Sequence, residues 1–220
     1  MATKAADPGS RGSSEGWLDA AYEMLIGSGV DSVRIALLSE RLNLSRTSFY
    51  WFFEDRDALL KALLERWRAK NTRNLVRQSQ AYAQSITEAI LNVFDCWLDS
   101  QLFDSKFEFA MRNWALQSVD VAEEIAKADN TRLAALREMF VRFGYQELPA
   151  DVRARTIYLT QIGYISMQTS ETLATRMARI PSYVEIFTAV PPRQPDLDRF
   201  FARHGYSEAT PRPKVLKRAR

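Results

Sequence analysis

The strongest constraint on the fold comes from residues 44–60, LSRTSFYWFFEDRDALL, where two sets of side chains follow helical spacing. One set lies three and four positions apart and is predicted to share the buried face of a short helix: Phe49, Phe52 and Phe53. The other set falls on the opposite face: Arg46, Thr47, Tyr50 and Trp51. Soluble proteins seldom leave arginine, tyrosine and tryptophan together on an outward helix face without a partner. The segment therefore predicts a helix with a binding face.

The outward side chains have the chemistry expected of a DNA recognition helix. Arginine and hydroxyl groups can read base edges, whereas a tyrosine hydroxyl and backbone amides can hold phosphates. The alternative is that the aromatic residues only fill a core, because three short helices can build many small folds. Ser48 is either a further contact or a solvent-facing residue.

The preceding residues predict the helix and the turn that such a unit requires. An apolar stripe predicts a helix over the residues that end at Asn43: Ile35, Leu38 and Leu42. Asparagine readily adopts the left-handed conformation of a helix end, and Ser45 can cap the next helix. A still earlier helix is predicted before the Gly27–Gly29 turn, with an apolar face formed by Leu18, Ala21, Tyr22, Leu25 and Ile26. Helix, short turn and helix is the geometry of a helix-turn-helix.

Residues 15–65 resemble the N-terminal domain of TetR-type bacterial transcription regulators. Four groups carry the resemblance: Ala20-Ala21 with Gly29, Ile35 to Asn43, Ser45 to Phe53, and Asp55 to Leu60. In that family the tyrosine and the next aromatic residue of the short helix meet DNA, the residues just before them face base edges, and a basic residue opening the fourth helix grips a phosphate. The resemblance implies DNA contacts by Tyr50, Trp51, Arg46, Thr47 and Arg56.

Two positions depart from the family pattern. Asn43 replaces the usual glycine, which the left-handed conformation of a helix end tolerates. Arg34 stands where a small hydroxyl residue often caps the second helix, and an arginine there could instead reach a phosphate. Asp55 as a cap places Arg56 in the first turn of the fourth helix, where free amides and the helix dipole favour an anion.

Composition and charge bound the remaining possibilities. A chain of 220 residues has room for one small and one larger domain, and a single cysteine suits a reducing cytoplasm. No apolar run is long enough for a membrane span, and the first dozen residues lack the core of a signal peptide. The net charge is only +3, so DNA affinity is expected to rest on a few placed contacts. We expect a cytoplasmic protein without membrane partners.

Beyond residue 80 every segment has helical periodicity, which predicts an all-α chain. Residues 1–14 are expected to be a disordered tail, 15–60 the helix-turn-helix DNA-binding domain, 61–205 a helical effector-binding and dimerisation domain, and 206–220 a basic tail. A long fourth helix is predicted to join the two domains. The prolines near the end predict short helices, such as 183–188 and 197–203, with a break at Pro181.

The resemblance implies that the C-terminal bundle binds a small-molecule effector and forms a homodimer. Large side chains could leave a mostly apolar cavity, or could simply fill the bundle: Phe94, Trp97, Phe107, Met111, Trp114, Tyr164 and Met167. The dimer surface is expected on residues 152–168 and 183–188. Gly163 costs a helix about 1 kcal/mol relative to alanine, so it either admits a second helix or is merely tolerated. Two recognition helices about 34 Å apart would meet successive major grooves of a near-palindromic operator in double-stranded DNA.

Other classes of protein fit less well. Cys96 and His204 could form a nucleophilic pair only if the fold joined them, and one cysteine with one histidine predicts no metal site or cofactor. A helical protein-interaction module would explain the bundle but would leave Arg46, Tyr50 and Trp51 without a role. The sequence therefore predicts a DNA-binding regulator, most consistent with a repressor released by a small apolar or aromatic effector, and not an enzyme.

Overall fold

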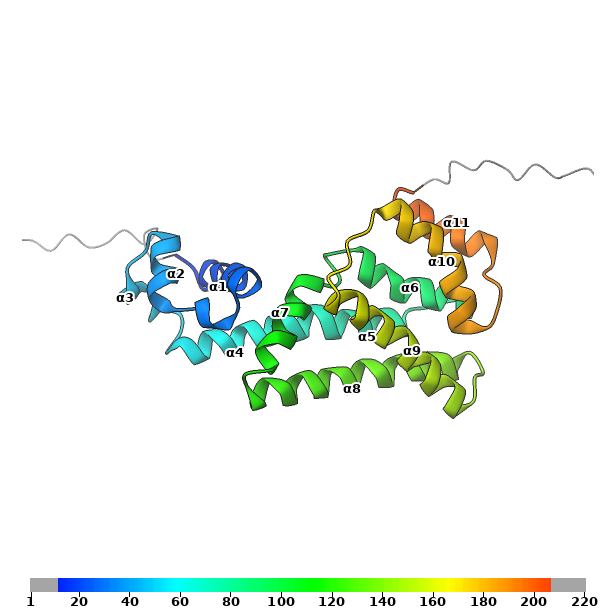
Figure 1. Cartoon of the computed structure of the whole chain (residues 1–220), viewed down its shortest axis with the longest axis horizontal. Helices are drawn as coiled ribbons and strands as arrows, with labels where there is room; N and C mark the ends of the chain where they lie inside the picture. The colour runs from blue at the N-terminus through cyan, green and yellow to red at the C-terminus, as the bar shows by residue number, and fades with distance from the viewer. Residues whose placement is uncertain (1–11, 207–220) are drawn as a thin grey trace, which may run out of the picture.

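The computed structural model describes residues 12–206, and this part of the chain contains helices and no strand (Figure 1). The prediction of an all-α fold is confirmed. Of the predicted tails, 1–14 and 206–220, residues 1–11 and 207–220 lie outside the described residues. Ser13 and Ser14, placed in the tail by the prediction, instead cap and open α1. The elements in order are α1 (Ser14–Ser28), η2 (Val30–Ser32), α2 (Ile35–Leu42), α3 (Arg46–Phe49), α4 (Arg56–Trp67), η3 (Arg68–Thr72), α5 (Arg73–Gln80), α6 (Ile86–Leu98), α7 (Ser105–Ala115), α8 (Val119–Arg142), α9 (Glu147–Ser166), α10 (Leu173–Thr188) and α11 (Gln194–Arg203).

The N-terminal lobe consists of α1, α2 and α3, and its helix ends follow the predicted chemistry. Asn43 closes α2 in the left-handed conformation, at φ 53°. The Ser45 side chain caps α3 by accepting a hydrogen bond from the Ser48 backbone N–H. The helices pack around fully buried side chains that include Trp17, Leu38 and Phe49. The helix-turn-helix is therefore built from the stripe and caps that the sequence indicated.

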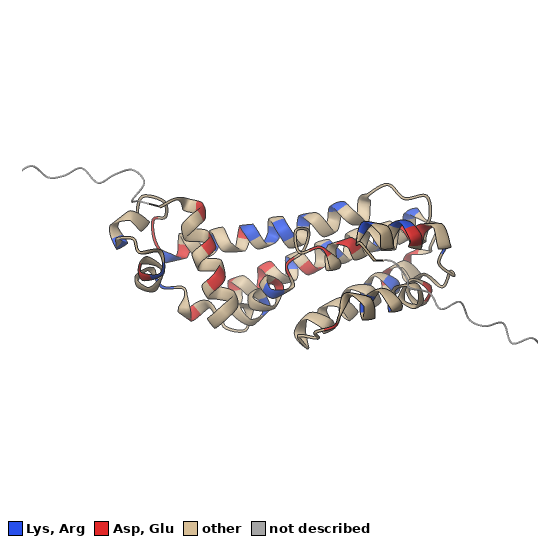
Figure 2. Cartoon of the chain, turned by 90° about the horizontal axis from the view of Figure 1, so that it is seen from above, with Lys and Arg blue, Asp and Glu red and all other residues tan. Residues whose placement is uncertain are grey.

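A long helical rod joins this lobe to the rest of the molecule (Figure 1). Asp55 caps α4 by accepting a hydrogen bond from the Ala58 backbone N–H at 2.7 Å. The rod continues through η3, a single π-helical turn, into α5. Figure 2 shows lysines and arginines spread along this rod. Arg66 of α4 pairs with Asp19 of α1 at 2.6 Å, which offsets part of the acidic charge on the first helix.

The C-terminal bundle is formed by α5, α6 and α8–α11 around a large apolar core. The predicted break at Pro181 is wrong, because α10 runs through it from Leu173 to Thr188. Proline removes one backbone hydrogen bond, and packing of Ile180 and Val184 into the core holds the helix on both sides. Similarly, α9 begins at Glu147 and includes Pro149 in its first turn, where proline is tolerated.

The core of the N-terminal lobe extends into the bundle. Its apolar cluster includes buried side chains of α7 and of the first half of α8: Phe107, Ala110, Met111, Val121, Ile125 and Ala128. The Tyr22 hydroxyl of α1 also donates to the Asp104 carboxylate, the cap of α7, at 2.6 Å. Helix α7 therefore packs against the N-terminal lobe as well as against the bundle. None of the helices between residues 12 and 206 is long and apolar enough to cross a membrane.

Candidate DNA-binding surface and effector pocket

Helix α3 is short and is held from behind by aromatic packing. Phe49 is fully buried and meets Trp17 edge to face, with ring centroids 5.3 Å apart. Phe53 stacks on the Phe49 ring, with ring centroids 5.6 Å apart. Such pairs fix ring orientation as well as burying area. The backbone that carries the outward side chains is therefore rigidly placed on α1.

The outward set lies where the sequence predicted it. Arg46 and Thr47 are exposed, and Tyr50 and Trp51 are 58% and 65% exposed. The Tyr50 ring stands edge-on to Phe49 at 5.4 Å, which orients its hydroxyl away from the core. These four residues, here called the recognition face, combine one cation, two hydroxyl groups and an indole on one small surface. Their contact with DNA stays a prediction.

Two residues of the same segment lie differently from expectation. Ser48 is only 4% exposed and its hydroxyl donates to the Ser45 carbonyl at 2.6 Å, so it is neither an outward contact nor a solvent-facing filler. Phe52 was expected in the core but is exposed. The reason is that α3 ends at Phe49, so residue 52 lies in a turn and no longer follows helical spacing.

Arg34 and Arg56, the two predicted phosphate contacts, flank the recognition face differently. Arg34 is exposed at the start of α2 and its Nε donates to the Asp31 carbonyl at 2.8 Å. Arg56 is half-buried, and it donates from Nε to the Val33 carbonyl at 2.6 Å and from Nη2 to the Val30 carbonyl at 2.8 Å. Two of its three guanidinium nitrogens therefore tie α4 to the segment before α2. Its phosphate contact stays a prediction beside this structural role.

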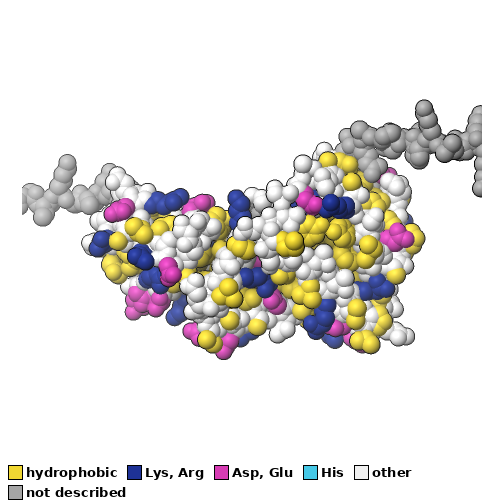
Figure 3. Space-filling view, in the orientation of Figure 1, with side chains coloured by type: hydrophobic (Ala, Val, Ile, Leu, Met, Phe, Trp, Pro, Cys, Tyr) yellow, Lys and Arg dark blue, Asp and Glu magenta, His cyan; other side chains and the backbone are white. Residues whose placement is uncertain are grey.

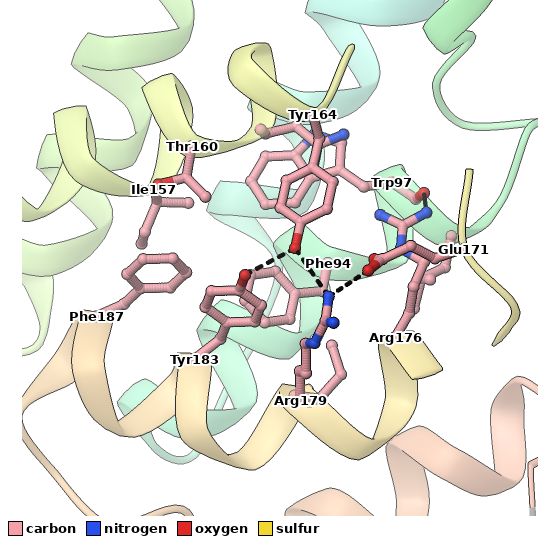
Figure 4. A pocket seen from close by; sticks show the side chains of 13 residues that line it. Phe94, Trp97, Ile157, Thr160, Tyr164, Glu171, Arg176, Arg179, Tyr183 and Phe187 are labelled. Atoms are coloured by element: carbon pink, nitrogen blue, oxygen red, sulfur yellow. Dashed lines mark hydrogen bonds and ion pairs between the residues drawn. The ribbon is translucent and has the colours of Figure 1, made fainter. Parts of the chain in front are cut away.

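A pocket opens in the bundle between α6, α9 and α10, and it contains three of the seven predicted effector residues: Phe94, Trp97 and Tyr164 (Figure 4). Its other lining residues were not predicted as effector contacts; they include Ile157 and Thr160 of α9 and Ile180, Tyr183 and Phe187 of α10. The α10 residues were missed because that helix was expected to be broken at Pro181. The cavity volume is ≈ 50 Å³, counted as the space in which the centre of a water molecule fits. That is room for about three to five waters, so a bulky ligand must widen it.

The other four predicted effector residues lie elsewhere. Phe107 and Met111 belong to the core shared with the N-terminal lobe. Trp114 packs against that core and lines a separate cavity beside the end of α1. Met167 follows the end of α9 and is 80% exposed. Periodicity identified these side chains as large and apolar, but it could not show that α7 turns toward the DNA-binding lobe.

The aromatic pocket has a polar rim. The Tyr164 and Tyr183 hydroxyls share a hydrogen bond of 2.8 Å, and this bond raises the pKa of Tyr183 (Figure 4). Arg179 pairs with Glu171 and lies 3.5 Å from the Tyr164 hydroxyl. Arg176 donates to the Trp97 carbonyl at 3.2 Å. The pocket therefore offers aromatic walls with hydroxyl and guanidinium groups at one side.

A buried polar cluster, here called the junction network, lies where α4 meets η3, α7, α8 and α9. Glu108 and Arg132 are both fully buried, and Arg132 Nη1 donates to a Glu108 carboxylate oxygen at 2.8 Å. Glu108 also accepts from Trp67 Nε1 at 2.7 Å and from the Asn71 amide at 2.9 Å. Arg132 reaches the Tyr158 hydroxyl at 2.8 Å. The network joins the rod, the shared core and α9.

The charges of the junction network are mutually compensated. Burial alone would raise the pKa of the Glu108 carboxyl, but Arg132, Arg112 and the hydrogen bonds to the carboxylate lower it to about 2. Arg112 also pairs with Asp129 at 2.6 Å, and Asp129 accepts from the Tyr158 hydroxyl. A desolvated ion pair of this kind is sensitive to the loss of either partner.

The residues considered for catalysis do not form a pair. Cys96 is buried, and desolvation raises the pKa of its thiol to about 12. His204 Nε2 lies 2.8 Å from an Asp95 carboxylate oxygen. Within residues 12–206, no group of three or more histidine, cysteine, aspartate or glutamate side chains is arranged to hold a metal ion.

Comparison with known proteins agrees with this geometry. Residues 18–63 match the model of the bacterial regulatory proteins of the tetR family, so this segment is a TetR-family DNA-binding domain and the predicted resemblance is confirmed. Similar solved structures include GusR of Salmonella enterica, at 16% identity and a TM-score of 0.59, covering 85% of this chain and 96% of that one. The fatty acid degradation regulator FadR of Bacillus halodurans has 14% identity and a TM-score of 0.59, covering 84% and 97%.

A transcriptional regulator of Rhodococcus sp. Rha1 is also similar, at 16% identity and a TM-score of 0.52, covering 87% of this chain and 97% of that one. At these identities the likeness establishes the fold, which extends over both the N-terminal lobe and the bundle. A search of curated proteins gives no match.

Proposed function

We propose that this protein is a sequence-specific DNA-binding transcriptional regulator, a homodimeric repressor that a small aromatic or apolar effector releases from its operator. The observation that carries the proposal is the recognition face. An arginine and a threonine of α3 and a tyrosine and a tryptophan of the turn after it lie exposed, while Phe49 anchors the helix in the core. An arginine suits the edge of a guanine, and a tyrosine hydroxyl suits a phosphate.

The exposed apolar face of α9 supports a dimer. Leu148, Val152 and Leu159 follow helical spacing along this face, and each is more than half exposed. Gly163 continues the stripe, and apart from its chain neighbours and the nearby backbone of α9, no atom of residues 12–206 lies within 4 Å of the position of a Cβ there. Packing among the described residues does not explain this glycine, and a second copy crossing at that point would. Ile186 of α10, 66% exposed, adds apolar area from the other expected dimer segment.

The route from effector to DNA runs through α9 in this proposal. Ile157 and Gln161 line the aromatic pocket, and Tyr158 between them belongs to the junction network. A ligand that widens the pocket would displace α9, and the network would pass that displacement to the rod through Glu108 and Trp67. The ligand can change DNA affinity only through different affinities for the two arrangements.

Electrophoretic mobility shift and footprinting with the DNA upstream of the protein's own gene test the proposal. We expect a protected near-palindromic site, bound by two protomers and retained against excess random DNA. Binding to all DNA alike, or to none, would contradict sequence-specific regulation. In the latter case the exposed Tyr50 and Trp51 would fit the alternative of a protein-interaction module. Addition of an aromatic ligand should weaken the shifted complex. If no ligand changes the affinity for DNA, the protein binds its operator constitutively and the effector part of the proposal is wrong.

A further inference from the structure

Arg176 is the least compensated charge of the aromatic pocket. It opens the second turn of α10 and is half-buried, and the one hydrogen bond of its side chain to the described residues goes to the Trp97 backbone carbonyl at 3.2 Å. No carboxylate of residues 12–206 forms an ion pair with it. A half-buried guanidinium normally finds an anion, because its planar fork matches a carboxylate with two parallel hydrogen bonds.

The remaining charges of the pocket do not fill this role. Glu171 is the one carboxylate of the lining, and it is already paired with Arg179 on the rim (Figure 4). Two arginines face a single glutamate, so the lining carries one uncompensated positive charge. The indole N–H of Trp97, which is nine-tenths buried, also has no hydrogen-bond partner. Arg176 and Trp97 both line the pocket, and each retains an unused donor group.

The walls around these donors suit a planar apolar group. Phe94 and Phe187 meet edge to face, with ring centroids 6.2 Å apart, and Tyr183 stacks on Phe187 at 5.4 Å. These rings come from α6 and α10, and Ile157 and Tyr164 of α9 close the opposite side. Aromatic walls bind rings through stacked and edge contacts. Hydrophobic side chains also gather over this part of the surface in Figure 3.

The pocket leads into a wider groove, and Arg176 lines both. The groove has a cavity volume of ≈ 680 Å³ and shares Gln161, Tyr164, Glu171 and Arg176 with the pocket. Its far side is formed by Glu23, Ile26 and Gly27 of α1. A ligand with its ring in the pocket and its polar end at Arg176 would therefore enter from the groove beside the DNA-binding lobe.

We propose that the effector is an aromatic carboxylic acid, whose ring packs among Phe94, Tyr183 and Phe187 and whose carboxylate pairs with Arg176. This inference rests on the proposed function of the pocket as the effector site. The carboxylate is held by the guanidinium nitrogens that do not donate to the Trp97 carbonyl. An uncharged aromatic compound of equal size gains the ring contacts but leaves the guanidinium unpaired.

Isothermal titration calorimetry on the full-length protein tests the assignment with matched acids and alcohols: benzoate and benzyl alcohol, phenylacetate and phenethyl alcohol, and indoleacetate and tryptophol. We expect at least one acid to bind about tenfold or more tighter than its alcohol, as a charge-assisted pair requires. Arg176→Gln should abolish this preference and leave the affinity for the alcohol unchanged within about twofold. Arg176→Lys keeps the positive charge but lacks the two parallel donors of the guanidinium, so it should retain part of the preference for the acid.

Arg137 is a partly exposed arginine of α8 outside the pocket lining. Arg137→Gln is therefore the matched control and should bind like the unmodified protein. The assignment is overturned if no acid is preferred, if no probe binds, or if Arg176→Gln and Arg176→Lys keep the full preference. Gel shifts on the same samples separate the two proposals. Specific DNA binding without a preference for acids would support the proposed regulator and contradict the aromatic-acid effector. A preference for acids without DNA binding would support the acid site and contradict the regulator.

Discussion

The two ends of the molecule use aromatic side chains in opposite ways. In the N-terminal lobe, Phe49 is buried so that Tyr50 and Trp51, next to it in the chain, can face outward on a fixed backbone. In the bundle, Phe94 and Phe187 turn inward around a small cavity. A recognition surface needs rigid support, whereas a ligand pocket needs walls that can separate. The packing of the N-terminal lobe must therefore keep the recognition face fixed, whereas the packing of the bundle must let the pocket walls separate.

The junction network lies between these two regions and gives the comparison a physical test. On one side it contacts Trp67 and Asn71 of the rod, and on the other Tyr158 of α9. Its ion pair, Glu108 with Arg132, is fully buried. If the two regions communicate, substitutions here should affect both the stability of the protein and the response of DNA binding to ligand.

The largest expected effect is that of Glu108→Gln. It leaves the Arg132 guanidinium buried without its carboxylate, so the free energy of unfolding should fall by about 3–5 kcal/mol. Urea denaturation followed by circular dichroism measures the change. Glu123→Gln, on the exposed face of α8, is the control and should stay within about 0.5 kcal/mol. An equally small change in Glu108→Gln would mean that the ion pair contributes little to holding the two regions together.

The same carboxylate predicts a pH dependence. Its pKa is lowered to about 2 in the folded protein, from an ordinary value of 4.5. The folded state therefore binds fewer protons, and the contribution of Glu108 is complete above pH 4.5 and is lost as the pH falls toward 2. The difference in unfolding free energy between the unmodified protein and Glu108→Gln should shrink across that interval. A difference that stays constant down to the lowest pH at which both proteins fold would contradict the lowered pKa.

The sequence was most informative where local rules decide the structure. The left-handed Asn43, the Ser45 cap and the Asp55 cap all depend on residues within one turn, and each was predicted at its position. Helical spacing alone predicted the four residues of the recognition face, although α3 ends earlier than expected. Phe52 was misplaced because α3 ends at Phe49 and its spacing does not continue into the turn that follows. Ser48 lies within α3, where its hydroxyl donates back to the Ser45 carbonyl and the side chain is buried.

The bundle was less predictable because its contacts join distant parts of the chain. Phe107 and Met111 have the spacing of pocket residues, but α7 packs on α1 and α4. Arg176 and Tyr183 enter the pocket only because α10 is continuous through Pro181. In the junction network, Arg132 is 24 positions from Glu108 and 60 positions from Thr72, to both of which it donates hydrogen bonds. No local pattern relates such residues.

Arg56→Gln distinguishes support of the recognition surface from direct binding. Loss of its charge-assisted bonds to the Val30 and Val33 carbonyls should lower the unfolding free energy by about 1–3 kcal/mol. Thermal and urea denaturation measure this loss. Arg34 donates one exposed hydrogen bond to a backbone carbonyl, so Arg34→Gln is the matched control. It should change the free energy of unfolding by less than about 0.5 kcal/mol. Weakened DNA binding with unchanged stability would make Arg56 a phosphate contact only.

Arg46→Ala examines the recognition face itself. Because Arg46 is exposed and has a base-reading side chain, its removal should cost about 1–3 kcal/mol of binding free energy on the operator and relax discrimination at one position. Competition binding with operators substituted one base pair at a time measures both effects. Arg137→Ala, in the bundle, should leave them unchanged. Equal losses on operator and random DNA would make Arg46 a phosphate contact.

Tyr50→Phe should have the smallest effect and the most uniform one. The ring keeps its edge-on packing against Phe49, so only the hydroxyl is removed and the fold should not change. Loss of one phosphate hydrogen bond should cost about 0.5–1.5 kcal/mol of binding free energy. Because phosphates carry no sequence information, operator and random DNA should lose the same amount. Because no charge is removed, the dependence of affinity on salt concentration should keep its slope.

A loss confined to one base pair would place the Tyr50 hydroxyl on a base edge instead. The division of labour on α3, with Arg46 reading sequence and Tyr50 holding the backbone, would then be wrong. The rigid support of the helix by Phe49 would stand in either case, because it depends on the packing of the core and not on the partner.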